Sequence, residues 1–370
     1  MLIGRHGERQ TIAAVVAGAR VGQSGVLVLT GEAGIGKSSL LTDAVEGCAG
    51  MNLLSAAGIR SERELSFGGL HQLLTPALRL LEKIPRPQAD ALSVALALAP
   101  GRGVDRFAVG AATLSLLCRY AEDRPVLVVI DDAHDLDRPS VEALLFAARR
   151  LTADPVALLV AHRAGETTLF AEAQLPTLTV GGLDVRSAGE LLSTGEPVPV
   201  GSELANRLHR ATGGNPLALL ELAGRLASLE RSSPEVPVPV PESIRQEYAR
   251  RIGRLSDDTR AVLLLAAVAD GELTVLARAC RSLDRPMQAL VQAEEADLVR
   301  VGPERVTFRH PLVRAAVYGS ATPEARRASH RCIAAALPES AVERRGWQRS
   351  EGCVGPDDEV AELMDRIGAA

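Results

Sequence analysis

The chain has 370 residues, a formal net charge of −5 and an aromatic content of only 2%. This length suits two or three domains, and the hydrophobic content of 46% is enough for ordinary cores built from Leu, Val and Ala. The acidic balance argues against a chain that binds nucleic acid along its whole length, although it permits a local basic patch.

Cysteine usage and hydropathy bear on the cellular compartment. The five cysteines are scattered without a CxxC pair, which favours a reducing compartment and argues against a zinc site. The opening "MLIGRHGERQ" has no signal-peptide pattern, and the longest apolar stretch, residues 261–269, is too short to span a bilayer. We therefore expect a soluble cytoplasmic protein that does not enter a membrane.

The amino-terminal half alternates apolar strands with helices. Apolar strands are predicted over residues 24–31, 51–58, 125–131, 155–163 and 176–183. Helices are predicted over residues 36–48, 69–84, 88–99 and 140–151. The last of these has Asp137 as its expected N-cap and Pro139 in its first turn. Continuous apolar strands that alternate with helices predict a parallel sheet covered on both faces, hence an α/β fold.

The second half changes to helices. They are predicted over residues 184–193, 202–212, 215–229, 243–253, 257–269, 272–282, 286–294, from 311, and 323–337. The stretch "RSSPEVPVPVPES" (231–243) is typical of an extended linker, and "ADLVRV" followed by "RVTFRH" predicts a short hairpin. Three helices followed by a hairpin resemble a winged helix, and the tail from residue 338 has a helical pattern.

The stretch "LTGEAGIGKSSLL" (29–41) has the pattern of a phosphate-binding loop, G-x-x-x-x-G-K-S/T. Its glycines let backbone N–H groups turn toward phosphate oxygens, and the following helix adds its positive amino-terminal end. Lys37 would reach the β and γ phosphates as a catalytic residue, and the Ser38 hydroxyl would ligate Mg²⁺. Lysine occurs at only two positions, so this placement is informative. The predicted nucleotide-binding residues here are Gly31, Gly34, Gly36, Lys37, Ser38 and Ser39.

Two later strand ends supply charged partners. Asp131, at the end of "VLVVID", is the predicted Mg²⁺ residue, and Asp132 would act as general base toward water at the γ-phosphate. The alternative is that both aspartates only form the turn. Arg163 ends "PVALLVAHR" and would sense the γ-phosphate, with a solvated arginine as the alternative. His134 and His162 lie near the same rim, and we interpret both as structural.

Seven segments together resemble one family. The chain is similar to the STAND class of signal-transduction ATPases, above all to the amino-terminal part of large ATP-binding LuxR-type (MalT-like) transcriptional regulators of bacteria. The matching segments cover almost the whole chain in family order: "LIGRHGE", "LTGEAGIGKSSLL", "SFGGLHQLL", "VLVVIDDAHDLDRPSVEALLFAARRL", "ATGGNPLALLELA", "FRHPLVRAAVYGSATPEARRASHRCIAAAL" and "GPDDEVAEL".

The resemblance implies further site residues. Gly4 and Arg5 match the family's opening motif, which lies near the adenine. Pro216, in "GGNP", matches the proline that packs on the nucleotide base. His310, in "FRHPLV", matches a winged-helix histidine that contacts the diphosphate of ADP. The family often has Asp after this histidine, where Pro311 stands here.

The resemblance also implies an arrangement of domains. These are a P-loop nucleotide-binding domain at 1–182, a helical lid subdomain at 183–232, a winged-helix-like domain at 233–320 and the start of a helical-repeat region at 321–370. In this class the winged helix is a regulatory lid, so we expect no direct DNA binding by this chain. The basic clusters near its end carry interleaved acids and are typical of solvated helix faces. In such regulators a long helical-repeat region and a DNA-binding output domain follow, and by this resemblance we expect the sequence to contain only the start of the repeats and no output domain.

We therefore expect an ATP-binding switch that hydrolyses ATP slowly. ADP would hold the closed form, and ATP with Mg²⁺ would favour an open, self-associating form. The effect would be transcriptional control in response to an inducer or a regulatory protein. One alternative is a free-standing ATPase whose turnover drives another protein or assembly. A weaker one is a scaffold with an inactive nucleotide site, which the intact motif residues argue against.

Overall fold

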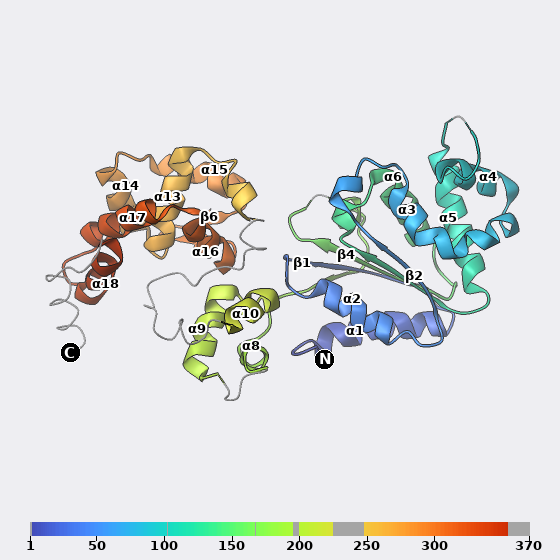
Figure 1. The fold of residues 1–370 in the computed structure, drawn as a ribbon, viewed down its shortest axis with the longest axis horizontal. Coiled ribbons are helices and arrows are strands. Elements are labelled where there is room, and N and C mark those ends of the chain that lie inside the picture. The colour runs from blue at the N-terminus through green and yellow to red at the C-terminus, as the bar shows by residue number, and fades with distance from the viewer. Residues whose placement is uncertain (1, 102, 167, 195–199, 225–247, 354–370) are drawn as a thin grey trace. The chain divides into compact units, whose positions relative to one another are not determined.

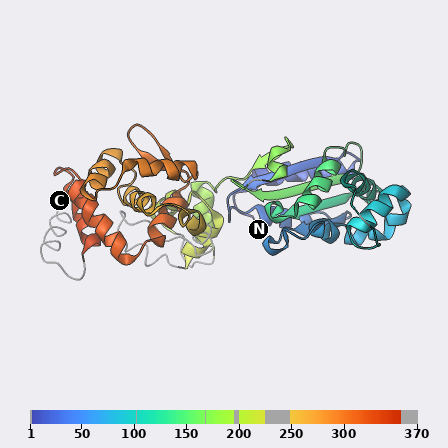
Figure 2. The same cartoon turned by 90° about the horizontal axis from the view of Figure 1, so that it is seen from above.

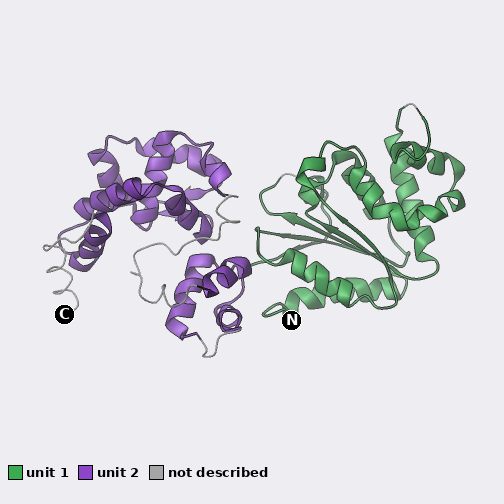
Figure 3. Cartoon of the chain, viewed as in Figure 1, with its two compact units in different colours: residues 1–181 green, residues 182–370 purple. Residues whose placement is uncertain are grey.

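The computed structural model describes residues 2–101, 103–166, 168–194, 200–224 and 248–353. The chain forms two compact units, Met1–Gly181 and Gly182–Ala370, shown in two colours in Figure 3. The predicted linker at 231–243 lies outside the described residues, as do the end of the helix predicted at 215–229 and the tail from 354.

The amino-terminal unit contains a five-stranded parallel sheet with the order β2-β3-β4-β1-β5. The strands are β1 (Gly25–Gly31), β2 (Asn52–Ala57), β3 (Val126–Asp131), β4 (Val156–Arg163) and β5 (Thr177–Thr179). They correspond to the five strands expected from the sequence. Figure 2 shows the sheet from above. Because all strands run the same way, their carboxyl ends meet at one edge of the sheet.

Helices cover both faces of the sheet, as predicted (Figure 1). On one face lie α1 (His6–Arg20) and α2 (Lys37–Glu46), and on the other lie α3 (Gly68–Leu74), α5 (Arg106–Ala121) and α6 (Arg138–Ala148). Successive strand side chains point to opposite faces. Leu27 and Leu29 therefore enter the core under α1 and α2, whereas Val28 enters the larger core on the opposite face.

The helices differ from the sequence-based prediction at several points. Two long helices, α1 and α5, were not expected. The helix predicted at 69–84 is instead α3 followed by the 3₁₀ helix η2 (Thr75–Lys83). Pro76, in the first turn of η2, has no N–H to continue the hydrogen bonds of α3. The helix predicted at 88–99 is α4 (Arg86–Ala95), which begins earlier because Pro87 fits its first turn.

Shorter elements complete this unit. They are η1 (Arg60–Glu62), η3 (Ala133–Asp135) and α7 (Leu169–Glu172). The turn between β3 and α6 contains η3, so it follows directly on the predicted acidic pair. Asp137 caps α6 as expected, because its side chain accepts a hydrogen bond from the Ser140 N–H at 2.9 Å.

The carboxy-terminal unit is mostly helical. Its first helices are α8 (Val185–Leu192), α9 (Ser202–Thr212) and α10 (Pro216–Ala223), which enclose a small apolar core. After residue 248 come α13 (Asp257–Val268), α14 (Leu273–Ser282), η4 (Met287–Ala289), α15 (Leu290–Glu295), the antiparallel hairpin β6 (Val299–Val301) and β7 (Val306–Phe308), α16 (Pro311–Ser320), α17 (Pro323–Ala336) and α18 (Val342–Gly352). All of these elements except α18 contribute residues to a second core. The single helix predicted at 286–294 is η4 followed by α15.

Among the described residues, no helix combines the length and the apolar character needed to cross a membrane.

Candidate functional site

The predicted phosphate-binding loop connects β1 to α2, in the strand–turn–helix context that its motif requires. Gly34 and Gly36 have φ values of 73° and 102°, a region that side chains with a Cβ rarely adopt. A Cβ on Gly31 would lie 2.6 Å from the carbonyl oxygen of Val180. The glycines are therefore needed for the course of this backbone, which wraps around the amino-terminal end of α2.

Lys37 is the first residue of α2 and is only 7% exposed. Its ammonium donates hydrogen bonds to the carbonyl oxygens of Gly31 and Glu32, both at 2.8 Å. Burial lowers the pKa of Lys37 to about 8, an effect that Asp132 opposes and Arg163 reinforces. A buried ammonium with a lowered pKa gains from a nearby anion such as a phosphate. Ser38 and Ser39 follow in the first turn of α2 and are exposed.

The strand order brings the other predicted charges to the same place. Because β4 lies between β1 and β3, its end is flanked by the phosphate loop on one side and by the acidic pair on the other. Arg163 is directly opposite Gly31 in the parallel register. Lys37 interacts electrostatically with Asp131, Asp132 and Arg163. The structure therefore brings together, at one edge of the sheet, four residues that lie far apart in the sequence.

The two aspartates differ in environment. Asp131 ends β3, and its Oδ1 accepts a hydrogen bond from the Asp132 N–H at 2.9 Å. The Asp132 side chain is 42% exposed, and its φ of 45° lies in the left-handed region. Backbone strain of this kind often occurs at functional sites. One aspartate is thus fixed at the strand end, whereas the other extends toward solvent.

The donor atoms here fit magnesium. Asp131 offers a carboxylate and Ser38 a hydroxyl, and Mg²⁺ prefers such hard oxygen ligands. No cluster of three or more His, Cys, Asp or Glu side chains suited to a metal occurs in the described part of the chain. Two protein oxygens match an ion that is held largely by phosphates and water, as is usual for Mg²⁺ in nucleotide sites.

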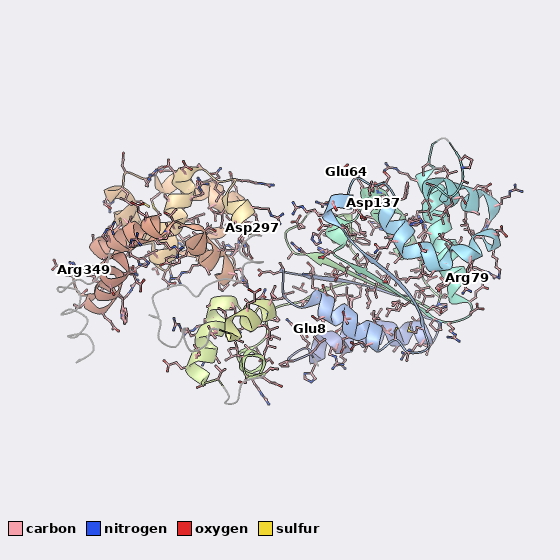
Figure 4. All side chains as sticks on the ribbon, viewed as in Figure 1. Glu8, Glu64, Arg79, Asp137, Asp297 and Arg349 are labelled. Atoms are coloured by element: carbon pink, nitrogen blue, oxygen red, sulfur yellow. The ribbon has the colours of Figure 1, made fainter. Side chains whose placement is uncertain are left out.

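Asp137 has a larger role than the N-cap predicted from the sequence. Its buried carboxylate, labelled in Figure 4, also accepts hydrogen bonds from the N–H groups of Phe67 at 2.7 Å and Gly69 at 3.0 Å. It thereby ties the start of α3 to the turn after β3. Gly58 packs against the same turn, because a Cβ there would lie 2.1 Å from the Asp132 carbonyl oxygen. The acidic turn is held by the segment that follows β2.

We expect Asp137→Ala to destabilise the amino-terminal unit by about 3 kcal/mol, because two buried N–H groups and one partly buried N–H group would lose a charged acceptor. Asp105 is the matched control, since it caps α5 through two exposed hydrogen bonds. Its replacement by alanine should cost only about 1 kcal/mol. Urea unfolding followed by circular dichroism measures both. If both variants lost the same free energy of unfolding, the hydrogen bonds to Phe67 and Gly69 would contribute nothing to stability.

Both histidines near the site are buried, each 4% exposed. His162 bonds to the Arg163 carbonyl through Nδ1 at 2.9 Å, which suits the predicted structural role. Neither ring nitrogen of His134 has a hydrogen-bond partner, and its Nδ1 lies 3.9 Å from the Asp132 carboxylate. Burial lowers the pKa of both rings. A neutral imidazole therefore lies beside the predicted general base, an environment that the sequence did not indicate.

The two residues that the resemblance adds in the carboxy-terminal unit belong to neighbouring turns. Pro216 begins α10, after Gly213 with φ of 60° and Gly214 with φ of 72°. His310 caps α16, where its Nδ1 accepts a hydrogen bond from the Leu312 N–H at 3.2 Å. A Cβ on Gly213 would lie 2.6 Å from His310 Nε2. The "GGNP" turn and the histidine are thus in direct contact, although about a hundred residues separate them in the sequence.

Burial lowers the pKa of His310 from its ordinary value of 6.5 to about 4. Between pH 6.5 and 4 the unfolded chain therefore binds more protons at this position than the folded unit. We expect stability to fall as pH drops through this window, by about 2 kcal/mol after allowance for partial solvent contact. Thermal unfolding of the wild type and His310→Gln across this range tests the prediction. A variant that loses stability with acid as steeply as the wild type would contradict it.

Comparison with known proteins shows what the amino-terminal unit is similar to. Residues 1–160 match a family described as the AAA ATPase domain. The matched residues include most of the parallel sheet and the phosphate loop, so this unit is similar to AAA ATPase domains and has a parallel-sheet α/β P-loop fold.

Three individual proteins are also similar to the chain. The chain is similar to the Walker-type ATPase paby2304 of Pyrococcus abyssi, with 15% identity and a TM-score of 0.52 over 85% of this chain and 96% of that one. A STAND protein with a tetratricopeptide repeat sensor from Pyrococcus horikoshii matches with 16% identity and a TM-score of 0.37, over 95% of this chain and 49% of that one. An uncharacterized protein of Rhizobium meliloti (strain 1021) is 25% identical over 92% of this chain. The chain spans 37% of that protein's length.

Proposed function

We propose that the chain is an ATP-binding switch of the STAND class that hydrolyses ATP slowly. The observation that carries this proposal is the single sheet edge that joins Lys37, Asp131, Asp132 and Arg163. Lys37 and the loop N–H groups would bind the β and γ phosphates, and Ser38 and Asp131 would hold Mg²⁺. Mg²⁺ would supply charge neutralisation at the phosphates. Arg163, at the end of the middle strand, would distinguish the triphosphate from the diphosphate.

The contact between the "GGNP" turn and His310 supports a nucleotide-sensing role for the carboxy-terminal unit. Pro216 and His310 are the residues that the resemblance assigns to the base and to the diphosphate, and His310 lies against Gly213 in the turn that precedes Pro216. Two groups that contact opposite ends of one ADP molecule must lie near each other. Their proximity is therefore what the switch hypothesis requires, and we propose that this turn binds ADP in the closed state.

We further propose that residues 233–320, of which the structure describes those from 248 on, form a winged-helix-like domain that acts as a lid. The order α13, α14, α15 and a hairpin supports this assignment, as does an isolated antiparallel bridge between Glu272 and Arg305, just before β7. The third helix, α15, carries Glu294 and Glu295 and no basic residue. A helix that reads DNA needs positive charge near phosphates, so this charge pattern supports a lid that does not contact DNA.

The output of the switch follows from the resemblance alone. We propose that this chain is the regulatory ATPase part of a LuxR-type transcriptional regulator, with self-association in the ATP-bound form and an inducer or regulatory protein as the signal. Residues 321–370 would begin its helical-repeat region. The cytoplasm is the compartment that fits these roles.

The test is to purify the chain without added nucleotide, denature it and identify what it releases by chromatography. Phosphate release with ATP and Mg²⁺ is then measured. The switch predicts near-stoichiometric ADP and far less than one turnover per second. An empty chain that turns over several times per second would contradict it and favour an ATPase whose turnover drives another assembly. Typical enzymes reach about 10 per second, so the two outcomes are well separated.

A further inference from the structure

Three arginines attach α1 to the loop and helix that bind phosphate in the proposed function. Arg5 bonds to the Ile35 carbonyl oxygen within the loop at 2.8 Å. Arg9 bonds to Asp43 on α2 at 2.8 Å, and Arg20 bonds to the carbonyl oxygen of Gly47 after α2 at 2.9 Å. The first helix thus lies along α2, and the two helices are neighbours in Figure 1.

Arg5 differs from the other two arginines in its burial. It is only 4% exposed, whereas the Arg9 side chain is 45% exposed. Its second amino group bonds to Glu8 at 2.7 Å, and Glu8 is labelled on α1 in Figure 4. A planar guanidinium held at two points has a fixed direction. The hydrogen bond to Ile35 is therefore oriented by Glu8 as well as by burial.

The hydrogen bond between Arg5 and the Ile35 carbonyl matters because of where Ile35 lies in the loop. Ile35 lies between Gly34 and Gly36, which both have positive φ values. Because glycine has no Cβ, these two residues can adopt many alternative backbone conformations. The carbonyl of Ile35 and the N–H of Gly36 belong to one planar trans peptide, so they point in opposite directions. Fixing the carbonyl toward Arg5 therefore fixes the direction of the Gly36 N–H, which points away from Arg5.

We propose that Arg5, oriented by Glu8, is a positioning residue that presets the phosphate-binding loop before nucleotide binds. The inference rests on the proposed nucleotide site and gives Arg5 a role other than contact with the base. The loss of the Arg5 guanidinium would weaken every ligand that the loop holds through phosphate, whatever base that ligand carries. A residue that contacts adenine would instead affect ligands according to their base.

The test compares Arg5→Met with Arg9→Met, a matched loss of an arginine on the same helix. Binding of ADP, GDP and inorganic pyrophosphate is measured by competition against a fluorescent ADP analogue. We expect Arg5→Met to weaken all three by the same factor, about tenfold, since one charged hydrogen bond is lost. Arg9→Met should leave all three within about twofold, because its ion pair is exposed. Arg5→Lys, which keeps the charge without the fork, should lie between them.

Hydrogen exchange provides a second readout that needs no ligand. Peptides covering residues 31–38 should exchange faster in Arg5→Met than in the wild type, and peptides of β4 should be unchanged. Weakening of ADP with unchanged pyrophosphate binding would overturn the proposal in favour of a base contact. Equal effects of Arg5→Met and Arg9→Met, or unchanged exchange in the loop, would also overturn it. If the wild type bound no nucleotide, the proposed function would fail, and the exchange comparison would still decide the role of Arg5.

Discussion

Lys37→Met is expected to abolish nucleotide binding without destabilising the fold. The variant removes the ammonium that would contact the β and γ phosphates, and we expect a loss of at least about a hundredfold in ADP and ATP affinity, or about 2.7 kcal/mol. Burial already lowers the pKa of this lysine to about 8, so its site disfavours the charge in the protein alone. An apolar side chain of similar length should therefore preserve the melting temperature or raise it slightly.

The only other lysine provides the control. Lys83 ends η2 and is exposed, so Lys83→Met should change neither affinity nor melting temperature. Calorimetric titration with ADP and a thermal melt without nucleotide test both variants. If Lys37→Met bound ADP as tightly as the wild type, the loop would not be a phosphate site. A large fall in melting temperature would instead mean that the bonds to the Gly31 and Glu32 carbonyls carry fold stability.

Asp132→Asn is expected to stop hydrolysis while keeping nucleotide binding. The amide cannot accept the proton of an attacking water, and removal of a general base typically costs about a hundredfold or more in rate. Asparagine tolerates the left-handed backbone that Asp132 adopts, with φ of 45°, so the turn should keep its shape. Single-turnover phosphate release measures the rate, and ATP titration in the same buffer measures the affinity.

Asp131→Asn serves as the comparison for this experiment. Its carboxylate ends β3 and would hold Mg²⁺, so this variant should lose the Mg²⁺-dependent part of ATP affinity. The two aspartates thus predict different defects, one in rate and one in binding. Unchanged hydrolysis in Asp132→Asn would assign water activation to another group, with His134 as the nearest buried base.

Part of the site was predictable because its signals are local. Eight contiguous residues, 31–38, carry the phosphate-loop pattern, since the backbone path around a phosphate needs glycines and a lysine at fixed spacing. Asp131, Asp132 and Arg163 were predicted because each ends an apolar strand, and the ends of parallel strands meet at one edge. The roles of Asp137 and Arg5 could not be found this way. Their hydrogen bonds reach residues about seventy and thirty positions away, and no local spacing records such contacts.

The sequence by itself determined the local features of the candidate site: a loop with the phosphate-binding pattern, an acidic strand end and a sheet of parallel strands. These features depend on glycine conformation, on charge and on periodicity, all of which short segments carry. Only the tertiary structure decided that β4 lies between β1 and β3, which places Arg163 beside Gly31. Only the tertiary structure brought His310 against Gly213. Strand order and helix packing depend on which apolar surfaces bury one another best across the whole chain, and no single segment encodes that choice.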